Sequence, residues 1–357
     1  MIEEFDYEDD IEKDEVDEHE FSTSYKLNCS GIDFDVCGLV RRQNAKSIYL
    51  PDFQRNYVWG KKRASKFIES LLLGLPIPSV CLYREEDNKQ IIIDGFQRLE
   101  TIRLFYSKVF ADGTPFKLSG VSKDYSGKTI DDLDETCKIK LDDTLIHATV
   151  VKADDPQEKN YNAVYLIFER LNTGGVKLSP QEIRNCIYHG EFQKVIEQLS
   201  NEANFKNYFA IDPKRKKDQE IILRLFSLSN NYSEYSGNMK EFLNSYMDSQ
   251  KNENETTLNK EISIFKETLD KVTKLNEEIF KPKGNLNLGI LDAVFVGTFI
   301  YMMNGKKIAE EKYASCIENM VNSDTFKKFI ETGKTHHTVQ LKSRIELAIN
   351  EIEKINE

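Results

Sequence analysis

The chain has 357 residues, with 49 Lys and Arg against 60 Asp and Glu, which gives a net charge of −11. Hydrophobic residues make up 39% of the chain and charged residues 31%, as is typical of a globular protein large enough to bury a core without disulfides. Eight Pro and 17 Gly exclude a collagen-like protein, and the net charge excludes a uniformly basic nucleic-acid binder.

The negative charge is concentrated at the N-terminus. Residues 1–20 contain twelve acids and one base, a net charge of −11, so the rest of the chain is neutral. High like charge with few apolar groups predicts that residues 1–22 form a disordered acidic tail. We interpret it as a solubility tail, with competition for a basic surface as the alternative. The acidic N-terminus is unlike a signal peptide, so we expect a cytoplasmic protein.

Residues 23–190 alternate strand and helix signals. The predicted strands are 25–28, 48–50, 79–83, 90–93 and 145–151. The predicted helices are 36–44, 61–73, 96–110, 130–137, 157–170 and one that begins after Ser179. Residues 61–73 carry apolar side chains at spacings of three and four, and Gly74 is expected to end this helix. The pattern predicts an α+β domain.

From residue 191 to 357 the apolar spacing is helical, which predicts an all-helical domain. Apolar residues recur at spacings of three and four in 258–279 and 341–355, which is typical of helix packing. A coiled-coil homodimer through the C-terminal helices is the alternative. Residues 286–303 resemble a membrane span, but Asp292 inside them favours a buried helix and no membrane. The six cysteines lack C-x-x-C spacing, and no metal-ligand pattern is evident.

The stretch at 90–103 predicts a strand, a tight turn and a helix. Ligands of α/β sheets gather where strands end, and a helix N-terminus attracts anions. Gly95 would let backbone approach a phosphate, while Gln97 and Arg98 would donate to it. Asp94 is suited to hold a cation or orient a water. The alternative is a purely structural turn with Asp94 as the helix cap.

The stretch at 50–67 mixes cations with aromatic rings. Residues 41–108 contain 13 basic and 7 acidic residues, a local net charge of +6. Phosphate neutralisation together with base stacking is typical of nucleic-acid surfaces. The alternative is a solvated helix face beside core aromatics. The candidate DNA-binding residues are Lys61, Lys62, Arg63 and Lys66, beside Phe53, Tyr57 and Trp59.

A third stretch, at 168–184, contains a loop with paired glycines. Asn172, Thr173, Gly174 and Gly175 could wrap a nucleotide with backbone amides, or they could form an ordinary connection between helices.

Three motifs together resemble a known family: PDFQRNYVW at 51–59, IDGFQRLETI at 93–102 and FERLNTGGVKLSPQEIRN at 168–185. In this order they resemble the N-terminal domain of GmrSD-type modification-dependent restriction enzymes, which is similar to the ParB/sulfiredoxin-like fold. The resemblance implies binding and hydrolysis of an NTP with Mg²⁺. It implies catalytic roles for Asp94 and Arg98, and nucleotide contacts from Gln54, Arg55, Gly95, Gln97, Arg98, Asn172, Thr173, Gly174 and Gly175.

This chain departs from the family pattern in two respects. Phe96 stands where the DGQQR-type motif usually has Gln, which weakens the expectation of hydrolysis more than that of binding. The histidine pattern of an HNH nuclease is missing, so cleavage of DNA would require a separate nuclease subunit. The resemblance implies a stand-alone NTP-hydrolysing sensor or regulator in restriction or antiphage defence, acting on DNA that carries modifications. The alternatives are a ParB-like nuclease and a non-catalytic DNA- or protein-binding module.

Overall fold

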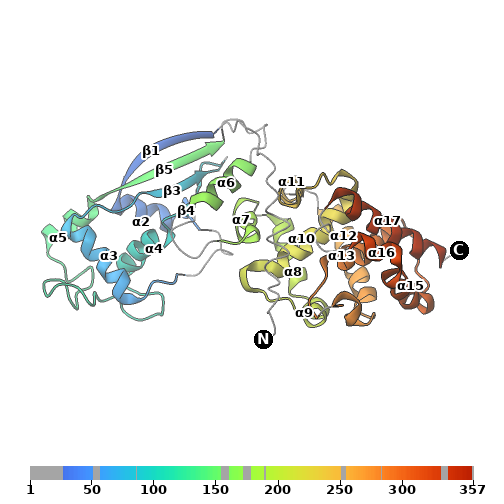
Figure 1. Ribbon diagram of the computed structural model, residues 1–357. Coiled ribbons are helices and arrows are strands. Elements are labelled where there is room, and N and C mark those ends of the chain that lie inside the picture. The colour runs from blue at the N-terminus through green and yellow to red at the C-terminus, as the bar shows by residue number, and fades with distance from the viewer. Residues whose placement is uncertain are drawn as a thin grey trace. The chain divides into compact units, whose positions relative to one another are not determined.

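The computed structural model describes residues 27–50, 57–85, 87–153, 161–171, 178–188, 190–250, 255–282, 284–330 and 337–355. The chain divides into two compact units, each described here by itself (Figure 1). The sheet unit contains the described residues before Ser179 together with Asn185–Ile187. The helical unit contains Ser179–Arg184 and the described residues from Tyr188 onward.

Within the described residues, the sheet unit is built on five strands in the order β1-β5-β3-β4-β2 (Figure 1). The strands are β1 (Leu27–Asp35), β2 (Ile48–Tyr49), β3 (Val80–Arg84), β4 (Gln90–Asp94) and β5 (Leu145–Ala153). β5 runs antiparallel to β1, and β4 runs antiparallel to β3. The pairs β2–β4 and β3–β5 are parallel, so the sheet is mixed.

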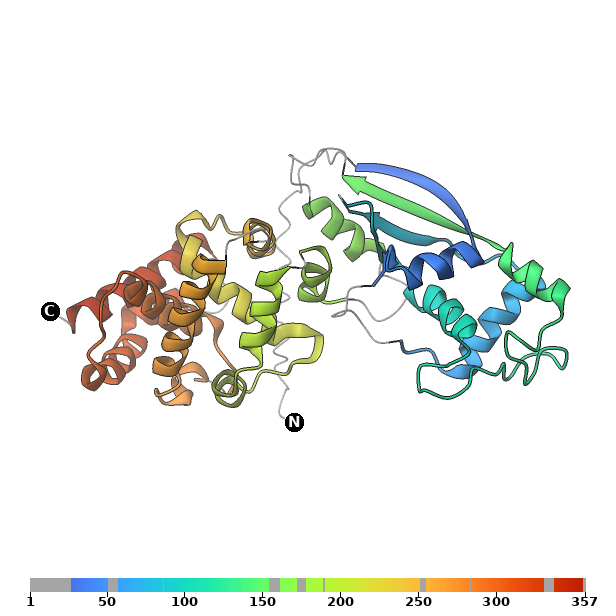
Figure 2. The same cartoon turned by 180° about the vertical axis from the view of Figure 1, so that it is seen from behind.

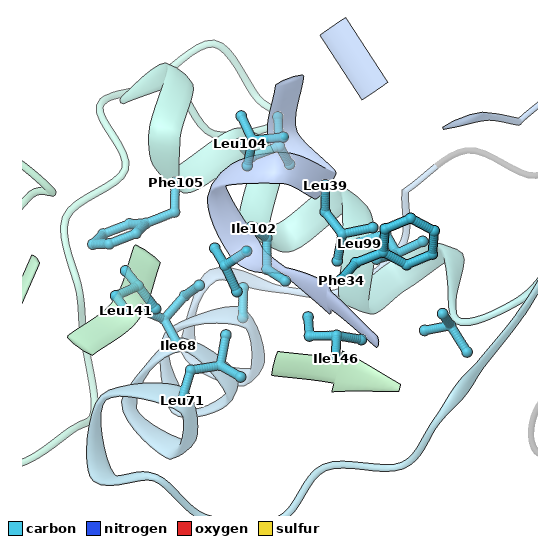
Figure 3. Close-up of a cluster of buried hydrophobic side chains, with 14 of the residues drawn as sticks. Phe34, Leu39, Ile68, Leu71, Leu99, Ile102, Leu104, Phe105, Leu141 and Ile146 are labelled. Atoms are coloured by element: carbon cyan, nitrogen blue, oxygen red, sulfur yellow. The ribbon is translucent and has the colours of Figure 1, made fainter. Parts of the chain in front are cut away.

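The helices of the sheet unit are α2 (Val36–Asn44), α3 (Lys61–Leu73), α4 (Phe96–Ser107), α5 (Glu135–Asp142) and α6 (Tyr161–Leu171). Figures 1 and 2 show α2, α3, α4 and α5 grouped on one side of the sheet, while α6 lies beside β4. Side chains from α2, α3 and α4 pack with the strands into one core, shown in Figure 3. Its members include Phe34, Leu39, Ile68, Leu71, Leu99, Ile102 and Ile146. Each such burial stabilises the fold by about 1.5–3 kcal/mol.

Local sequence signals set several boundaries as predicted. Asp35 caps α2 by accepting a hydrogen bond from the Gly38 amide, and α2 spans the predicted residues 36–44. α3 spans the predicted 61–73 and ends at Gly74, whose φ of 75° lies in the left-handed region that glycine favours. β4 is buried along Ile91–Ile93, which confirms the buried strand expected from its apolar run.

Other boundaries differ from the prediction. β1 extends to Asp35 instead of ending near Asn28, because it pairs with the whole of β5, from Leu27 opposite Ala153 onward. α4 ends at Ser107, where Lys108 adopts a φ of 65°. Val109, which the predicted helix 96–110 included, lies beyond the end of α4 and is 46% exposed.

The predicted helix at 130–137 begins later, at Glu135. Asp134 caps α5 by accepting from the Cys137 amide at 2.8 Å, so the residues before Asp134 form the preceding turn.

The remaining helices are α7 (Pro180–Ile187), α8 (Glu191–Ser200), α9 (Ala203–Phe209), α10 (Lys217–Asn231), α11 (Met239–Gln250), α12 (Glu255–Val272), α13 (Leu288–Leu291), α14 (Gly297–Met303), α15 (Glu310–Asn322), α16 (Asp324–Phe329) and α17 (Thr338–Lys354). They belong to the helical unit, apart from Asn185–Ile187 at the end of α7, which belong to the sheet unit. α7 begins after Ser179, as predicted, and the structure adds a capping box between Ser179 and Glu182. α12 ends at Val272, so the predicted seam up to 279 is divided between a helix and a separate 3-10 turn.

Asp292 lies at the start of a π-helical segment, Asp292–Val296, and is completely buried. Both of its carboxylate oxygens accept from Arg224 at 2.9 Å, and Arg344 donates to it at 2.6 Å. Burial alone would raise the pKa of Asp292, but the two guanidinium groups outweigh it and hold the pKa below its usual value.

None of the helices that the structure describes combines the length and apolarity needed to cross a lipid bilayer.

These observations confirm the predicted fold class: a mixed α+β unit followed by a helical region. All six cysteines are free thiols.

Candidate functional site

Gly95 forms the turn between β4 and α4. Its φ of 97° is left-handed, and a Cβ there would lie 2.4 Å from Val80 Cγ1. Only glycine satisfies both constraints, so the strand passes directly into the helix. Gly95, not Asp94, is the N-cap residue, and no side chain caps α4. The first-turn amides of α4 therefore remain without a side-chain cap, as an anion-binding helix N-terminus requires.

Arg98 is anchored beside this turn. Its Nη2 donates to Asp94 Oδ2 at 2.7 Å, and its Nη1 donates to the Pro78 carbonyl at 2.7 Å. The Arg98 side chain is 13% exposed, whereas that of Asp94 is 45% exposed. A guanidinium held at two points loses little further freedom on binding a phosphate, and it still has other N–H donors. Asp94 thus positions Arg98, and the sequence did not predict this pairing.

Cys81 faces Asp94 across the β3–β4 ladder. Burial raises the pKa of the Cys81 thiol to about 12, and the negative charge of Asp94 contributes to the increase. The thiol is therefore neutral at physiological pH and is not a nucleophile.

Gln97 points toward the chain that leads into α3. Its Oε1 accepts from the Val58 amide at 3.0 Å and from the Trp59 amide at 3.2 Å. Since the oxygen of a side-chain amide has two lone pairs, these two bonds occupy it. The oxygen of Gln97 therefore has a structural role.

A second contact joins the same two segments. The Tyr57 hydroxyl lies 2.6 Å from Thr101 Oγ1, and Thr101 Oγ1 donates to the Gln97 carbonyl at 2.6 Å. Thr101 is fully buried, and the Tyr57 ring packs edge-on against Phe110. Tyr57 and Thr101 are 44 residues apart in the sequence, and no local pattern predicted their contact.

Phe96, the residue that departs from the family motif, is partly buried and packs against the hydrophobic core. It occupies the first position of α4 with an apolar side chain. Its side chain therefore contributes packing to the site and no hydrogen-bonding group.

The N-terminal turns of α3 present exposed cations. Lys62, Arg63 and Lys66 are exposed, and within the described part of the chain none of them forms a salt bridge. The first turn of α3 contains no acid, and its N-cap Gly60 supplies no capping side chain. Cations at the positive end of a helix dipole are unfavourable by roughly 0.3–1 kcal/mol each, so stability does not explain them.

Lys61 differs from these three neighbours. Its Nζ donates to Thr114 Oγ1 at 2.6 Å and lies 5.2 Å from the centre of the Phe110 ring. The structure therefore places Lys61 against the loop that follows α4, while the other three cations face solvent.

Trp59 is partly buried at the start of α3. The Arg63 guanidinium lies 4.5 Å from its ring centre, and Phe67 packs edge-on against it. The indole thus fixes the direction of Arg63, and a stacked base would have to share the ring with this cation.

Several predicted residues lie outside the described residues. They are Gln54, Arg55, Asn172, Thr173, Gly174 and Gly175. Among the residues described, the structure brings together Asp94, Gly95, Gln97 and Arg98 at one turn, with Val58 and Trp59 beside them. Arg184, which follows the paired glycines in the sequence, is fully buried in the helical unit against Glu220 at 2.7 Å and Asn244 at 2.9 Å. Arg184 therefore stabilises the core of the helical unit and is not exposed to a ligand.

Within the described residues, no group of three or more His, Cys, Asp and Glu side chains could hold a metal ion. Asp94 is the carboxylate at the Gly95 turn. Magnesium in nucleotide sites is commonly held by one or two carboxylates and by the phosphates themselves. The residues present fit an ion that arrives with a nucleotide.

Comparison with known proteins gives one family. Residues 36–189 match the family model described as the GmrSD restriction endonuclease, N-terminal domain. Neither the curated proteins nor the solved structures contain a significant match. The matched segment covers the strands and helices from α2 to α7, including the Gly95 turn and the α3 cations. Residues 36–189 of this chain are therefore similar to the N-terminal domain of GmrSD restriction endonucleases.

Proposed function

We propose that the sheet unit binds a nucleoside triphosphate at the Gly95 turn and a DNA backbone along α3, as a sensor or regulator in restriction or a related defence process. The match of residues 36–189 to the GmrSD N-terminal domain supports the general role in restriction acting on DNA. The proposal of nucleotide binding depends on one observation. The Arg98 guanidinium is held by two hydrogen bonds beside the N-terminus of α4, which no side chain caps.

The phosphate chemistry follows from the geometry of this turn. The first-turn amides of α4 would donate to phosphate oxygens, and Gly95, whose left-handed φ and close approach to Val80 require glycine, places that turn directly after β4. Arg98 would add a charge-assisted bond, and Asp94 keeps its guanidinium oriented. A Mg²⁺ bound with the nucleotide would neutralise phosphate charge, and the partly exposed Asp94 is the carboxylate available to contact it.

The DNA part depends on α3. Lys62, Arg63 and Lys66 are exposed cations without described acidic partners, on the first two turns of one helix. Contacts of this kind neutralise phosphates without reading sequence. In this proposal the DNA carries modifications, and a separate nuclease subunit cuts it.

A specific observation favours a second candidate, a nucleotide-binding module without turnover. Phe96 packs against the core and offers no polar group at the position where the family motif usually has Gln. If that Gln serves hydrolysis in relatives, this chain would bind nucleotide and fail to hydrolyse it.

Titration with ATP, GTP, CTP and UTP in the presence of Mg²⁺ tests the nucleotide site. We expect at least one to bind, and Arg98→Ala to weaken it about 10- to 100-fold, because a charged hydrogen bond contributes roughly 1.5–3 kcal/mol. Arg103→Ala is the matched control, since Arg103 lies on the same helix and pairs with Glu100. Wild-type protein that binds none of the four would refute the proposal, and measured turnover would decide between the two candidates.

A further inference from the structure

Gln97 connects the two halves of the proposed site. It is the second residue of α4, and its Oε1 accepts hydrogen bonds from the Val58 and Trp59 amides. Gly60, the residue after Trp59, is the N-cap of α3. One residue therefore separates the partners of Gln97 from the helix that carries Lys62 and Arg63.

The main chain of Gln97 provides a second attachment. Its carbonyl accepts from Thr101, whose Oγ1 also meets the Tyr57 hydroxyl. Thr101 is fully buried, so this contact cannot be exchanged freely with water. The chain at 57–59 is thus fastened to the first turn of α4 at both of its ends.

We propose that Gln97 is a positioning residue that couples the Gly95 turn to the α3 cations, so that bound nucleotide raises the affinity for DNA. This inference rests on the proposed function. A ligand at the Gly95 turn holds the first turn of α4, and through Gln97 it holds residues 57–59 and the start of α3. Cations that are already positioned lose less freedom on binding phosphates. By linkage, DNA raises nucleotide affinity by the same factor.

The contacts also argue against Gln97 Oε1 as a phosphate ligand. That oxygen already accepts two N–H groups. A phosphate oxygen is itself an acceptor, so it gains nothing from a second acceptor.

The test measures binding of a duplex DNA at fixed salt with and without a saturating nucleotide, using each of the four NTPs with Mg²⁺. In wild-type protein we expect the nucleotide to strengthen DNA binding at least about fivefold, the lower end of typical coupling. Gln97→Met removes the acceptor and keeps a side chain of similar length. In this variant we expect the ratio of the DNA affinities with and without nucleotide to fall below about twofold. The affinities for nucleotide alone and for DNA alone are measured in each variant, so that the coupling is taken as a ratio within one protein.

Two further variants sharpen the test. Gln97→Glu keeps an oxygen that accepts from both amides, so the nucleotide should strengthen DNA binding by the same ratio as in wild-type protein. Ser70→Ala is the matched control, because Ser70 Oγ donates within α3, to the Lys66 carbonyl at 2.9 Å. It should leave the coupling unchanged. If Gln97→Met is poorly folded by its unfolding midpoint, Gln97→Asn replaces it, since its amide is one methylene too short.

The outcomes separate this inference from the proposed function. Coupling that survives in Gln97→Met, or wild-type protein that binds both ligands without mutual strengthening, would overturn the inference and leave the proposed function intact. Loss of nucleotide binding in Gln97→Met as large as that in Arg98→Ala would make Gln97 a direct ligand and would also overturn it. Wild-type protein that binds no NTP would refute both.

Discussion

Gly95 and Val80 approach each other so closely that a Cβ on Gly95 would lie 2.4 Å from Val80 Cγ1. This contact connects the packing of β3 directly to the turn that begins α4. The turn is therefore shaped by a neighbouring strand as well as by its own sequence.

Gly95→Ala should destabilise the protein by about 2–4 kcal/mol, because it combines left-handed backbone strain with overpacking against Val80. Gly113→Ala is the control, since Gly113 also has a left-handed φ, of 80°, but a Cβ there would meet no described atom within 4 Å. It should cost only about 1–2 kcal/mol. Urea unfolding measures both. Val80→Ala added to Gly95→Ala should recover part of the difference, and no recovery would show that the clash is unimportant.

Asp292→Asn should destabilise the helical unit by about 3–5 kcal/mol, because Arg224 and Arg344 would remain buried without their counter-charge. Glu351→Gln is the control, since Glu351 pairs with Lys354 near the surface and should change stability by less than about 1 kcal/mol. Chemical denaturation, monitored through the loss of helix content, measures the free energy of unfolding of both variants. Similar small losses in the two variants would mean that the buried cluster is not a stabilising centre.

The same carboxylate should make stability depend on acid. The pKa of Asp292 is lower in the folded protein than in the unfolded chain, so its contribution is complete above the unfolded value of about 3.9. It is lost as the pH falls from there through the folded value. Below about pH 4, wild-type protein should therefore lose stability more steeply than Asp292→Asn. Parallel acid titrations of the two proteins would contradict this origin.

Cys81 should resist alkylation in the folded protein. Burial, assisted by Asp94, raises its pKa to about 12, so almost no thiolate is present at about pH 8. Cys29 and Cys37 are exposed and provide internal controls. Brief treatment with iodoacetamide followed by peptide mass spectrometry should show modification of these two and not of Cys81 until the protein is unfolded. Equal labelling of all three would show that β3 opens readily.

The salt dependence of DNA binding should identify the α3 cations. Each phosphate contact adds about 0.9 to the slope of log affinity against log salt, so replacing Lys62, Arg63 and Lys66 by Ala together should reduce it by roughly 2–3. Lys61→Ala should leave the slope unchanged, because the Lys61 ammonium is bound to Thr114. A slope that responds to Lys61 and not to the other three would contradict this surface.

Local signals in the sequence were sufficient for much of the fold. Gly74 ends α3 because its left-handed conformation suits glycine, and the apolar run Ile91–Ile93 forms a strand because it is buried. The three ordered motifs also identified the family that residues 36–189 match. These features depend on neighbours in the chain, so they can be read from the sequence alone.

Tertiary contacts decided what each site residue does. Nothing within the motif around Gly95 indicates that Arg98 is held by the Pro78 carbonyl or that Gln97 accepts from Val58, because these partners lie 20 and 39 residues away. Arg184 follows the paired glycines in the sequence, yet the packing of α7 buries it beside Glu220. Charge and spacing thus determined which residues could serve the site. Only the folded chain determined which of their hydrogen-bonding groups are already occupied, because those partners come from distant segments.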